Sequence, residues 1–184
     1  MAVKDYHLDK FQIISSQESI LDEIFRVATS VPDELFFKAN RNWSVAENME
    51  HLRISFYKSW QGIFIPKLIL KWRFGKPTHS SLPYEELEQV YRQKIEAGAR
   101  AQGIYKPRVK AGRYSKQQII DRARRASNRY LDEIRYYWED EHIDQYQLPH
   151  PILGPVTARE LMYFNIFHCW MHFNAIRRQK ESAY

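Results

Sequence analysis

Apolar residues recur three or four positions apart in four long segments of the chain, which is the spacing of an amphipathic helix. In the first segment the apolar stripe runs through Ile20, Ile24 and Ala28. Alternation of β-branched residues, the pattern of a strand, is hard to find, so we expect an all-α fold. The pattern predicts four main helices, near residues 8–30, 45–71, 116–139 and 157–180.

Three of these segments begin with a capping box, in which a Ser or Thr side chain and a Glu or Gln three residues later bond to each other's free backbone N–H groups. The boxes run from Ser44 to Glu47, from Ser115 to Gln118 and from Thr157 to Glu160. Each is followed by apolar residues at helical spacing, and each therefore predicts the start of a helix.

The second and third predicted helices are joined by about 45 residues, from Lys71 to Ser115. This connection holds glycine and proline turns, a polar helical stretch over residues 84–101 and a basic loop. Because it can cross the length of a helical bundle, the second and third helices can run parallel. We predict a four-helix bundle with a long crossover between helices 2 and 3, in a single domain over residues 1–184.

Composition narrows the class of protein. Cys169 is the only cysteine, so no intramolecular disulfide can form. No segment approaches the ~20 apolar residues of a membrane span, and the first residues hold no apolar run of the kind found in signal peptides. We expect a cytoplasmic protein with no membrane partner.

The net charge of +6 is concentrated between Lys106 and Arg129, where nine Lys and Arg residues accompany the single acid Asp121. Such a run is usually a solvated loop and helix face. The alternative is a patch that binds nucleic acid or an acidic partner, although no recognised nucleic-acid motif accompanies it. If the segment folds toward a reactive site, it can instead receive an anionic cosubstrate.

The candidate chemistry begins with His168 and His172, which lie four residues apart in an apolar helix and therefore on one face. Two such imidazoles can ligate one metal ion, or they can be core residues bonded to carbonyl or carboxylate groups. Cys169 stands where a zinc protease has its general-base Glu, which argues against that class. A metal site needs a third ligand, and His51, among apolar residues of the second helix, is the best placed. We expect the other histidines to be solvated: His7, His79, His142 and His150.

Two motifs make the sequence familiar. The pattern Trp-Ser-x-x-Glu-x-x-x-His-Leu, from Trp43 to Leu52, resembles the second-helix signature of the DinB/YfiT-like superfamily of metal-dependent enzymes. The stretch from His150 to Ile176 resembles the closing segment of the same superfamily: a His-Pro-x-x-Gly turn, a Thr-initiated helix and then the paired histidines. Phe173 and Ala175 stand where that segment often has Arg and Gln, a departure that bears on substrate class and dimer contacts.

The resemblance implies a four-helix bundle, often a homodimer, in which three histidines hold a divalent metal ion, usually zinc or nickel. Carried over by position, the metal ligands are His51, His168 and His172. Related members include transferases and isomerases that use low-molecular-weight thiols. Other members have no known metal or activity, so the resemblance leaves open whether this chain is an enzyme, and the catalytic residues stay unknown.

Several neighbours of the three histidines have structural and functional interpretations. Glu47 is either an outer partner of His51 or only the acid of the capping box, which we favour. Asn48 is a candidate to face the site, and Trp43 is expected to plug the end of the helix. Cys169 is expected to be a small buried residue and His150 a structural residue of a turn. An aromatic group is expected to line the core: Tyr130, Tyr136, Tyr137 and Trp138.

Two functional hypotheses follow. The first is a metal-dependent enzyme that transfers a thiol to a small electrophilic molecule, a detoxification type of reaction. The second is a non-enzymatic helical binding module that uses the basic face Lys106–Arg129 for nucleic acid or an acidic partner. Nucleic-acid binding would weaken steeply with salt, whereas metal binding would weaken with acid because imidazole must be neutral to ligate.

Overall fold

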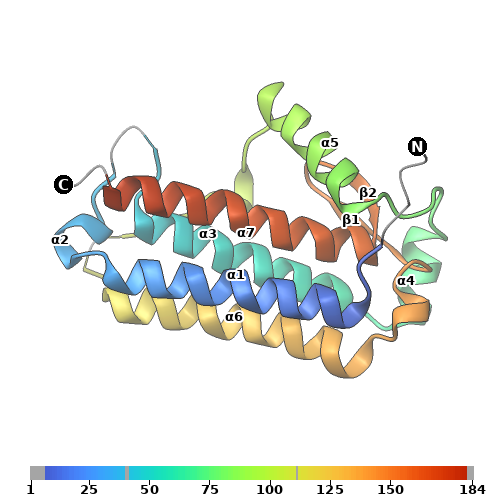
Figure 1. The fold of residues 1–184 in the computed structure, drawn as a ribbon. Coiled ribbons are helices and arrows are strands. Elements are labelled where there is room, and N and C mark those ends of the chain that lie inside the picture. The colour runs from blue at the N-terminus through green and yellow to red at the C-terminus, as the bar shows by residue number, and fades with distance from the viewer. Residues whose placement is uncertain (1–6, 40–41, 111, 182–184) are drawn as a thin grey trace.

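The computed structural model describes residues 7–39, 42–110 and 112–181, and most of these residues are helical. The described residues also form one small two-stranded sheet, so the prediction of an all-α fold is confirmed only in part. Four long helices lie side by side, as Figure 1 shows. They are α1 (Lys10–Ser30), α3 (Val45–Ile63), α6 (Lys116–Tyr137) and α7 (Ala158–Glu181).

Shorter elements gather around the ends of the long helices (Figure 1). The helical ones are α2 (Asp33–Phe36), α4 (Lys67–Phe74), α5 (Tyr84–Glu96) and the 3-10 turns η1 (Gly103–Tyr105) and η2 (Asp140–His142). Strands β1 (Gln147–His150) and β2 (Gly154–Thr157) form an antiparallel hairpin, with Gln147 opposite Thr157 and His150 opposite Gly154. Gly154 has φ +87°, a conformation that glycine adopts without strain. The hairpin leads directly into α7.

All three predicted capping boxes are confirmed. The side chains of Ser44 and Ser115 accept hydrogen bonds from the third residue of α3 and α6, and Glu47 and Gln118 accept from the cap residues in return. At α7, Thr157 Oγ1 accepts from the Glu160 N–H at 3.1 Å, and Glu160 accepts from the Thr157 N–H at 2.8 Å. These local pairs explain why the starts of the helices were readable from sequence.

The prediction of one continuous helix over residues 45–71 is wrong, because the helix is interrupted at residues 64–66. Helix α3 ends at Ile63, and a new helix, α4, begins at Lys67. Pro66 accounts for the break, because proline has no N–H for a helical hydrogen bond and disfavours a helical residue before it. The apolar stripe continues across this break, so periodicity alone did not show it.

The core lies between the four long helices, and the aromatic residues of α6 divide between core and surface. Tyr130 and Trp138 are each 1% exposed, as predicted. The Trp138 ring N–H donates to the Ile63 carbonyl at 3.2 Å. Tyr136 and Tyr137 are 67% and 66% exposed, so the prediction that they line the core is wrong. Near the end of α6 they occupy the outer face of the helix, where adjacency in sequence to buried residues does not imply burial.

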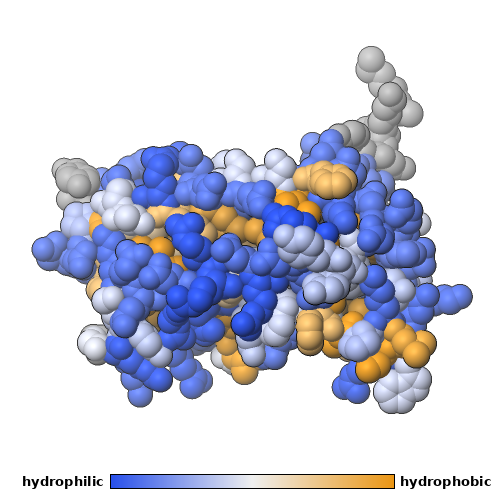
Figure 2. All heavy atoms as spheres, turned by 90° about the horizontal axis from the view of Figure 1, so that it is seen from below, coloured by the Kyte–Doolittle hydropathy of each residue, from blue (hydrophilic) through white to orange (hydrophobic). Residues whose placement is uncertain are grey.

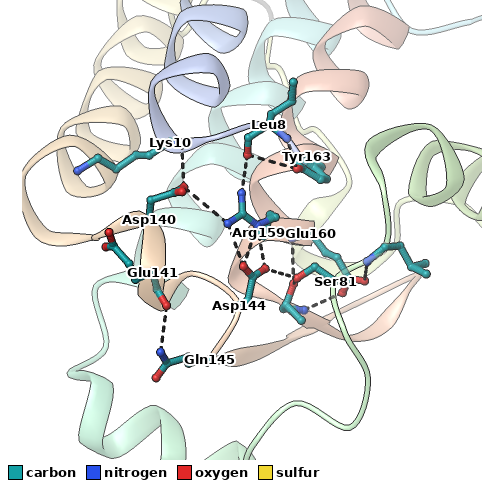
Figure 3. Close-up of polar contacts among 12 residues, drawn as sticks. Leu8, Lys10, Ser81, Asp140, Glu141, Asp144, Gln145, Arg159, Glu160 and Tyr163 are labelled. Atoms are coloured by element: carbon teal, nitrogen blue, oxygen red, sulfur yellow. Dashed lines mark hydrogen bonds and ion pairs between the residues drawn. The ribbon is translucent and has the colours of Figure 1, made fainter. Parts of the chain in front are cut away.

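A polar network holds the start of α7, as Figure 3 shows. The Arg159 guanidinium donates to Asp144 from Nε at 2.8 Å and from Nη2 at 2.9 Å, and from Nη1 to the Leu8 carbonyl. Ser81, in the connection between α4 and α5, also donates to Asp144. The network therefore ties the chain before α1 and the crossover connection to the first turn of α7.

Glu160, next to Arg159, is 1% exposed and is the acceptor of a second set of bonds. Besides the Thr157 N–H, its carboxylate accepts from the Leu82 N–H at 2.9 Å and from His79 Nε2 at 3.1 Å. The prediction that His79 is solvated is confirmed, since its side chain is 40% exposed, although it also bonds to this buried carboxylate. The loop that carries His79 is thus held against the start of α7.

Exposed apolar side chains gather on and beside α4. Phe64, Leu68 and Trp72 are 58%, 81% and 82% exposed and lie four residues apart. Figure 2 shows hydrophobic side chains at the end of the molecule where α4 lies, next to a surface that is otherwise mostly hydrophilic. An apolar cluster of this kind on a protein surface often marks a contact. Among the residues that the structure describes, no helix has the length and apolar character needed to cross a membrane.

The Arg159–Asp144 contact generates a stability prediction. Burial alone would raise the pKa of Asp144, but hydrogen bonds from Arg159 and Ser81 and the guanidinium charge bring this pKa below its ordinary value. Asp144→Asn should therefore lower the free energy of unfolding at pH 7 by about 1–2 kcal/mol, a figure reduced for the partial exposure of Asp144. Because the lowered pKa stabilises only the ionised form, the loss should shrink as the pH falls below about 4.

Urea unfolding at pH 7 and at pH 3.5 measures this difference. Asp132→Asn is the control, since the Asp132–Arg135 pair lies on the surface with Asp132 56% exposed, and it should change stability by less than about 0.5 kcal/mol. Equal effects of the two substitutions would contradict the role given to Asp144.

Candidate metal centre

The structure brings three histidine nitrogens to one point. His51 comes from α3, and His168 and His172 come from α7. His168 Nε2 lies 3.1 Å from His51 Nε2 and 3.1 Å from His172 Nε2, and the ligand atoms of all three lie within 4.8 Å of one another. Two nitrogens bound to one tetrahedral zinc ion at 2.0–2.1 Å are about 3.3 Å apart. The spacing of the cluster is therefore close to that of a ligand set.

The local sequence explains this convergence. His168 and His172 are one helical turn apart and face the interior, 3% and 9% exposed. Every residue of α7 from Ala158 to Cys169 is buried, so the first half of the helix lies within the core. His51 is 6% exposed on the face of α3 that packs against α7. The capping box at Ser44 fixes the residue at which α3 begins.

Two of the imidazoles are oriented by bonds to their other nitrogen. His51 Nδ1–H donates to the Tyr105 carbonyl, and His172 Nδ1–H donates to Asn48 Oδ1, both at 2.7 Å. The amide of Asn48 is itself oriented, because its Nδ2 donates to the carbonyls of Trp43 at 3.1 Å and Ser44 at 2.9 Å. The prediction that Asn48 faces the site is confirmed, with His172 as its partner.

These bonds determine where the protons and lone pairs lie. A carbonyl oxygen can only accept, so His51 and His172 carry their protons on Nδ1 and present an Nε2 lone pair to the cluster. His168 can donate to one of these lone pairs but not to both. Burial lowers the pKa of all three imidazoles, which keeps them neutral near pH 7; for His51 the Tyr105 bond partly opposes this effect. Neutral imidazoles with converging lone pairs suit a divalent cation.

Aromatic rings surround the cluster. The Trp43 ring lies 4.9 Å from the His51 ring and is stacked 6.1 Å from the His172 ring. On the other side, the Phe164 ring is stacked 4.7 Å from the His168 ring. Trp43 was expected to plug the helix end, and its contact with two histidines shows that it also covers the cluster. These rings reduce the access of water to the three nitrogens.

Two neighbours are not part of the cluster. Cys169 is fully buried, and Gln17 Nε2 donates to its Sγ at 3.3 Å. Burial raises the pKa of this thiol to about 12, so it is a small packed residue, as predicted. Glu47 accepts from the N–H and the hydroxyl of Ser44, which confirms its role as the acid of the capping box.

A cavity of about 540 Å³ adjoins the cluster and has His51 and His168 in its wall. Tyr105, Arg100 and His150 also line it, so the crossover and the hairpin both contribute. His150 does hold a turn, as predicted, since its Nδ1 accepts from the N–H groups of Ile152 and Leu153. The expectation that His150 is solvated is wrong, because it is 8% exposed.

None of the described residues of the basic segment Lys106–Arg129 lines this cavity. The charged residues that line the cavity are Lys58 and Arg100, which lie outside that segment. Arg124 lies 4.2 Å above the Phe25 ring and Arg129 lies 4.8 Å above the Trp60 ring. Stacking on aromatic rings accounts for part of the basic composition. Tyr105, the residue directly before the segment, does reach the site, because its backbone carbonyl accepts a hydrogen bond from His51. A contact to a backbone atom has no pattern of side chains from which the sequence could predict it.

A family model described as the DinB superfamily matches residues 18–176. The chain belongs to the DinB superfamily. The match begins in α1, ends in α7 and includes all three clustered histidines. Comparison with the curated proteins and with the solved structures gives no match. Membership of the DinB superfamily and the three-histidine cluster are both compatible with a divalent metal ion.

The bond between His172 and Asn48 generates a prediction on metal affinity. Asn48→Ala removes the acceptor that orients His172, and should raise the zinc dissociation constant about 10–100-fold. Asn48→Asp keeps an oxygen acceptor and should raise it less. Competition with a chromophoric zinc chelator measures both constants. Asn128→Ala, at an exposed position of α6, is the control. Parent affinity in Asn48→Ala would show that His172 needs no such support.

Proposed function

We propose that this DinB superfamily protein binds one divalent metal ion, zinc or nickel, through His51, His168 and His172, and is a metal-dependent enzyme acting on a small molecule. The observation that carries the proposal is the convergence of three neutral imidazole nitrogens, two of them oriented by second hydrogen bonds, beside a cavity whose wall includes His51 and His168. A purely structural histidine cluster has no need of an adjoining cavity large enough for a small molecule.

Three protein ligands are the number found at catalytic rather than structural zinc sites, and a divalent ion held in this way supplies an open position at which a water or thiol loses its proton more readily. The residues of the chain contribute orientation and exclusion of water. Tyr105 and Asn48 hold the imidazoles, and Trp43 and Phe164 cover them.

The reaction class that we propose is transfer of a low-molecular-weight thiol to an electrophilic carbon. In such a transfer the thiol loses its proton, a carbon–sulfur bond forms and the leaving group departs with its electron pair. Support for this class is the resemblance of the two sequence motifs to a superfamily that includes transferases and isomerases using such thiols. The alternative, a non-enzymatic module using Lys106–Arg129, stays a prediction.

Within the same proposal, the chain is one cytoplasmic domain, and the four long helices constitute the four-helix bundle with a long crossover that the resemblance implies. The crossover between α3 and α6 contains α4, α5 and η1 and supplies the Tyr105 carbonyl to His51. This contact gives the long connection a role at the site.

Elemental analysis of tag-free protein tests the metal proposal. We expect near-stoichiometric zinc or nickel in the parent and a loss of most of it in His51→Ala and His168→Ala, with helicity by circular dichroism retained. Cys169→Ala, which changes a buried neighbour outside the cluster, should keep its metal. Parent protein that contains no metal and takes up neither zinc nor nickel would contradict the proposal.

Metal-loaded protein should then accelerate formation of the thioether between small thiols and 1-chloro-2,4-dinitrobenzene, followed by absorbance. His51→Ala should reduce this rate at least about 100-fold if the ion is required. Metal-replete protein that does not accelerate the reaction with any thiol or electrophile in the screen would remove the support for thiol transfer while leaving the metal site intact.

We also propose that the chain forms a homodimer through the exposed apolar face of Phe64, Leu68 and Trp72. Burial of these side chains between two copies would remove a large apolar area from water and would stabilise the dimer by about 25 cal/mol for each Å² of that area. Leu68 and Trp72 belong to α4, and Phe64 directly follows the last residue of α3, so the face lies at one end of the long helices.

Trp72→Glu should place a charge in that interface and convert the dimer to a monomer, with at least a tenfold rise in the dimer dissociation constant, measured by sedimentation equilibrium. Tyr136→Glu, at another exposed aromatic position, is the control. A monomeric parent protein would exclude the dimer, and a dimeric Trp72→Glu would place its interface elsewhere.

A further inference from the structure

We propose that the cavity beside the histidine cluster binds a small organic anion, an apolar molecule that carries a carboxylate, and that His150 donates a hydrogen bond to it. The inference deepens the proposed function, on which it rests for the role of the cavity, by naming the chemical class of the molecule bound. It also assigns a binding role to a histidine outside the three-histidine cluster.

The charged residues that line the cavity are all cationic. Lys58, on α3, and Arg100, in the crossover, both lie in its wall, and among the residues that the structure describes no Asp or Glu does. Lys58 Nζ donates to Gln61 at 2.8 Å, and Arg100 Nη1 donates to the carbonyls of Ile95 and Ala99. These bonds use only some of the N–H groups of each cation, so others can bind an anion.

His150 adds a neutral donor with a defined orientation. The N–H groups of Ile152 and Leu153 both donate to its Nδ1, at 3.2 and 3.0 Å, so Nδ1 carries a lone pair and the proton is on Nε2. No acceptor for this Nε2–H lies among the described residues, although the imidazole is 8% exposed and lines the cavity. A donor at a cavity wall that has no acceptor within the protein suits an acceptor atom of a bound molecule.

His150 lies close to the three-histidine cluster. The Phe164 ring lies 4.2 Å from the His150 ring and 4.7 Å from the His168 ring, so one aromatic side chain separates the two imidazoles. Burial lowers the pKa of His150 to about 4, so that at pH 7 it donates as a neutral group. One molecule in the cavity can therefore approach both His150 and the cluster.

The remaining lining selects for an apolar body. Tyr91, Leu148, Leu161 and Phe164 contribute to the wall, and a volume of about 540 Å³ lies in the range of small-molecule sites. An inorganic anion would leave most of this apolar surface in contact with water. A carboxylate attached to a ring or chain uses the cations, the His150 donor and the apolar wall together.

The test uses phenylacetate as the probe and phenylacetamide, its neutral analogue, as the matched control. Protein with ¹⁵N-labelled histidine is examined by NMR, both as purified and after removal of metal by a chelator. We expect His150 to be the Nε2–H tautomer in both samples. Phenylacetate should shift its Nε2 resonance saturably, with a dissociation constant at least about tenfold below that of phenylacetamide.

Substitutions separate charge from donor. Lys58→Gln and Arg100→Gln should each weaken phenylacetate binding about three- to tenfold with little effect on phenylacetamide, whereas Lys94→Gln, an exposed lysine outside the cavity lining, should change neither. His150→Asn keeps an oxygen acceptor for the turn and has an amide N–H donor, at a different position from the Nε2–H of His150. His150→Asp keeps the acceptor but adds a charge and no donor. Phenylacetate affinity should fall from parent to Asn to Asp.

Three results would overturn the inference: an Nδ1–H tautomer of His150, equal affinity for the carboxylate and the amide, or parent affinity in His150→Asp. Because the chelated sample is measured as well, the outcome is independent of whether the three histidines bind metal. If the purified protein holds no metal and still binds phenylacetate, this inference stands and the proposed metal chemistry fails.

Discussion

The structure of the candidate site depends on two hydrogen bonds that point away from it. His51 donates from Nδ1 to the Tyr105 carbonyl and His172 donates from Nδ1 to Asn48. Because both acceptors are oxygens that cannot donate in these contacts, the Nε2 lone pairs of both histidines must face His168. Without these bonds, either ring could take the other tautomer, and the three nitrogens would form an ordinary hydrogen-bonded chain of core histidines.

The rest of the fold can be understood as the support for these bonds. The Ser44 capping box fixes the start of α3, and the same stretch of chain orients Asn48. The network of Arg159, Asp144 and Glu160 holds the start of α7 to the crossover and to the chain before α1. The crossover returns to α3 at η1, where it provides Tyr105. Segments far apart in sequence thus converge where the imidazoles need partners.

Much of this arrangement was predictable from sequence, for identifiable reasons. Capping boxes and apolar periodicity are local, so the starts of α3, α6 and α7 were correct, and the four-residue spacing of His168 and His172 placed both on one face. The break at Pro66 was missed because the apolar stripe continues through it. The surface positions of Tyr136 and Tyr137 and the bond between His79 and Glu160 depend on tertiary packing, which a local pattern does not contain. The Tyr105 acceptor is a backbone atom and has no sequence pattern at all.

The central proposal is that three imidazoles, and no sulfur, hold one divalent ion. X-ray absorption spectroscopy at the zinc edge of zinc-loaded protein tests this claim most directly, because it reports the ligand atoms themselves. We predict three imidazole nitrogens at about 2.0–2.1 Å, with a light atom completing the shell and no sulfur at about 2.3 Å. A sulfur ligand, or a shell with one imidazole or none, would contradict the account.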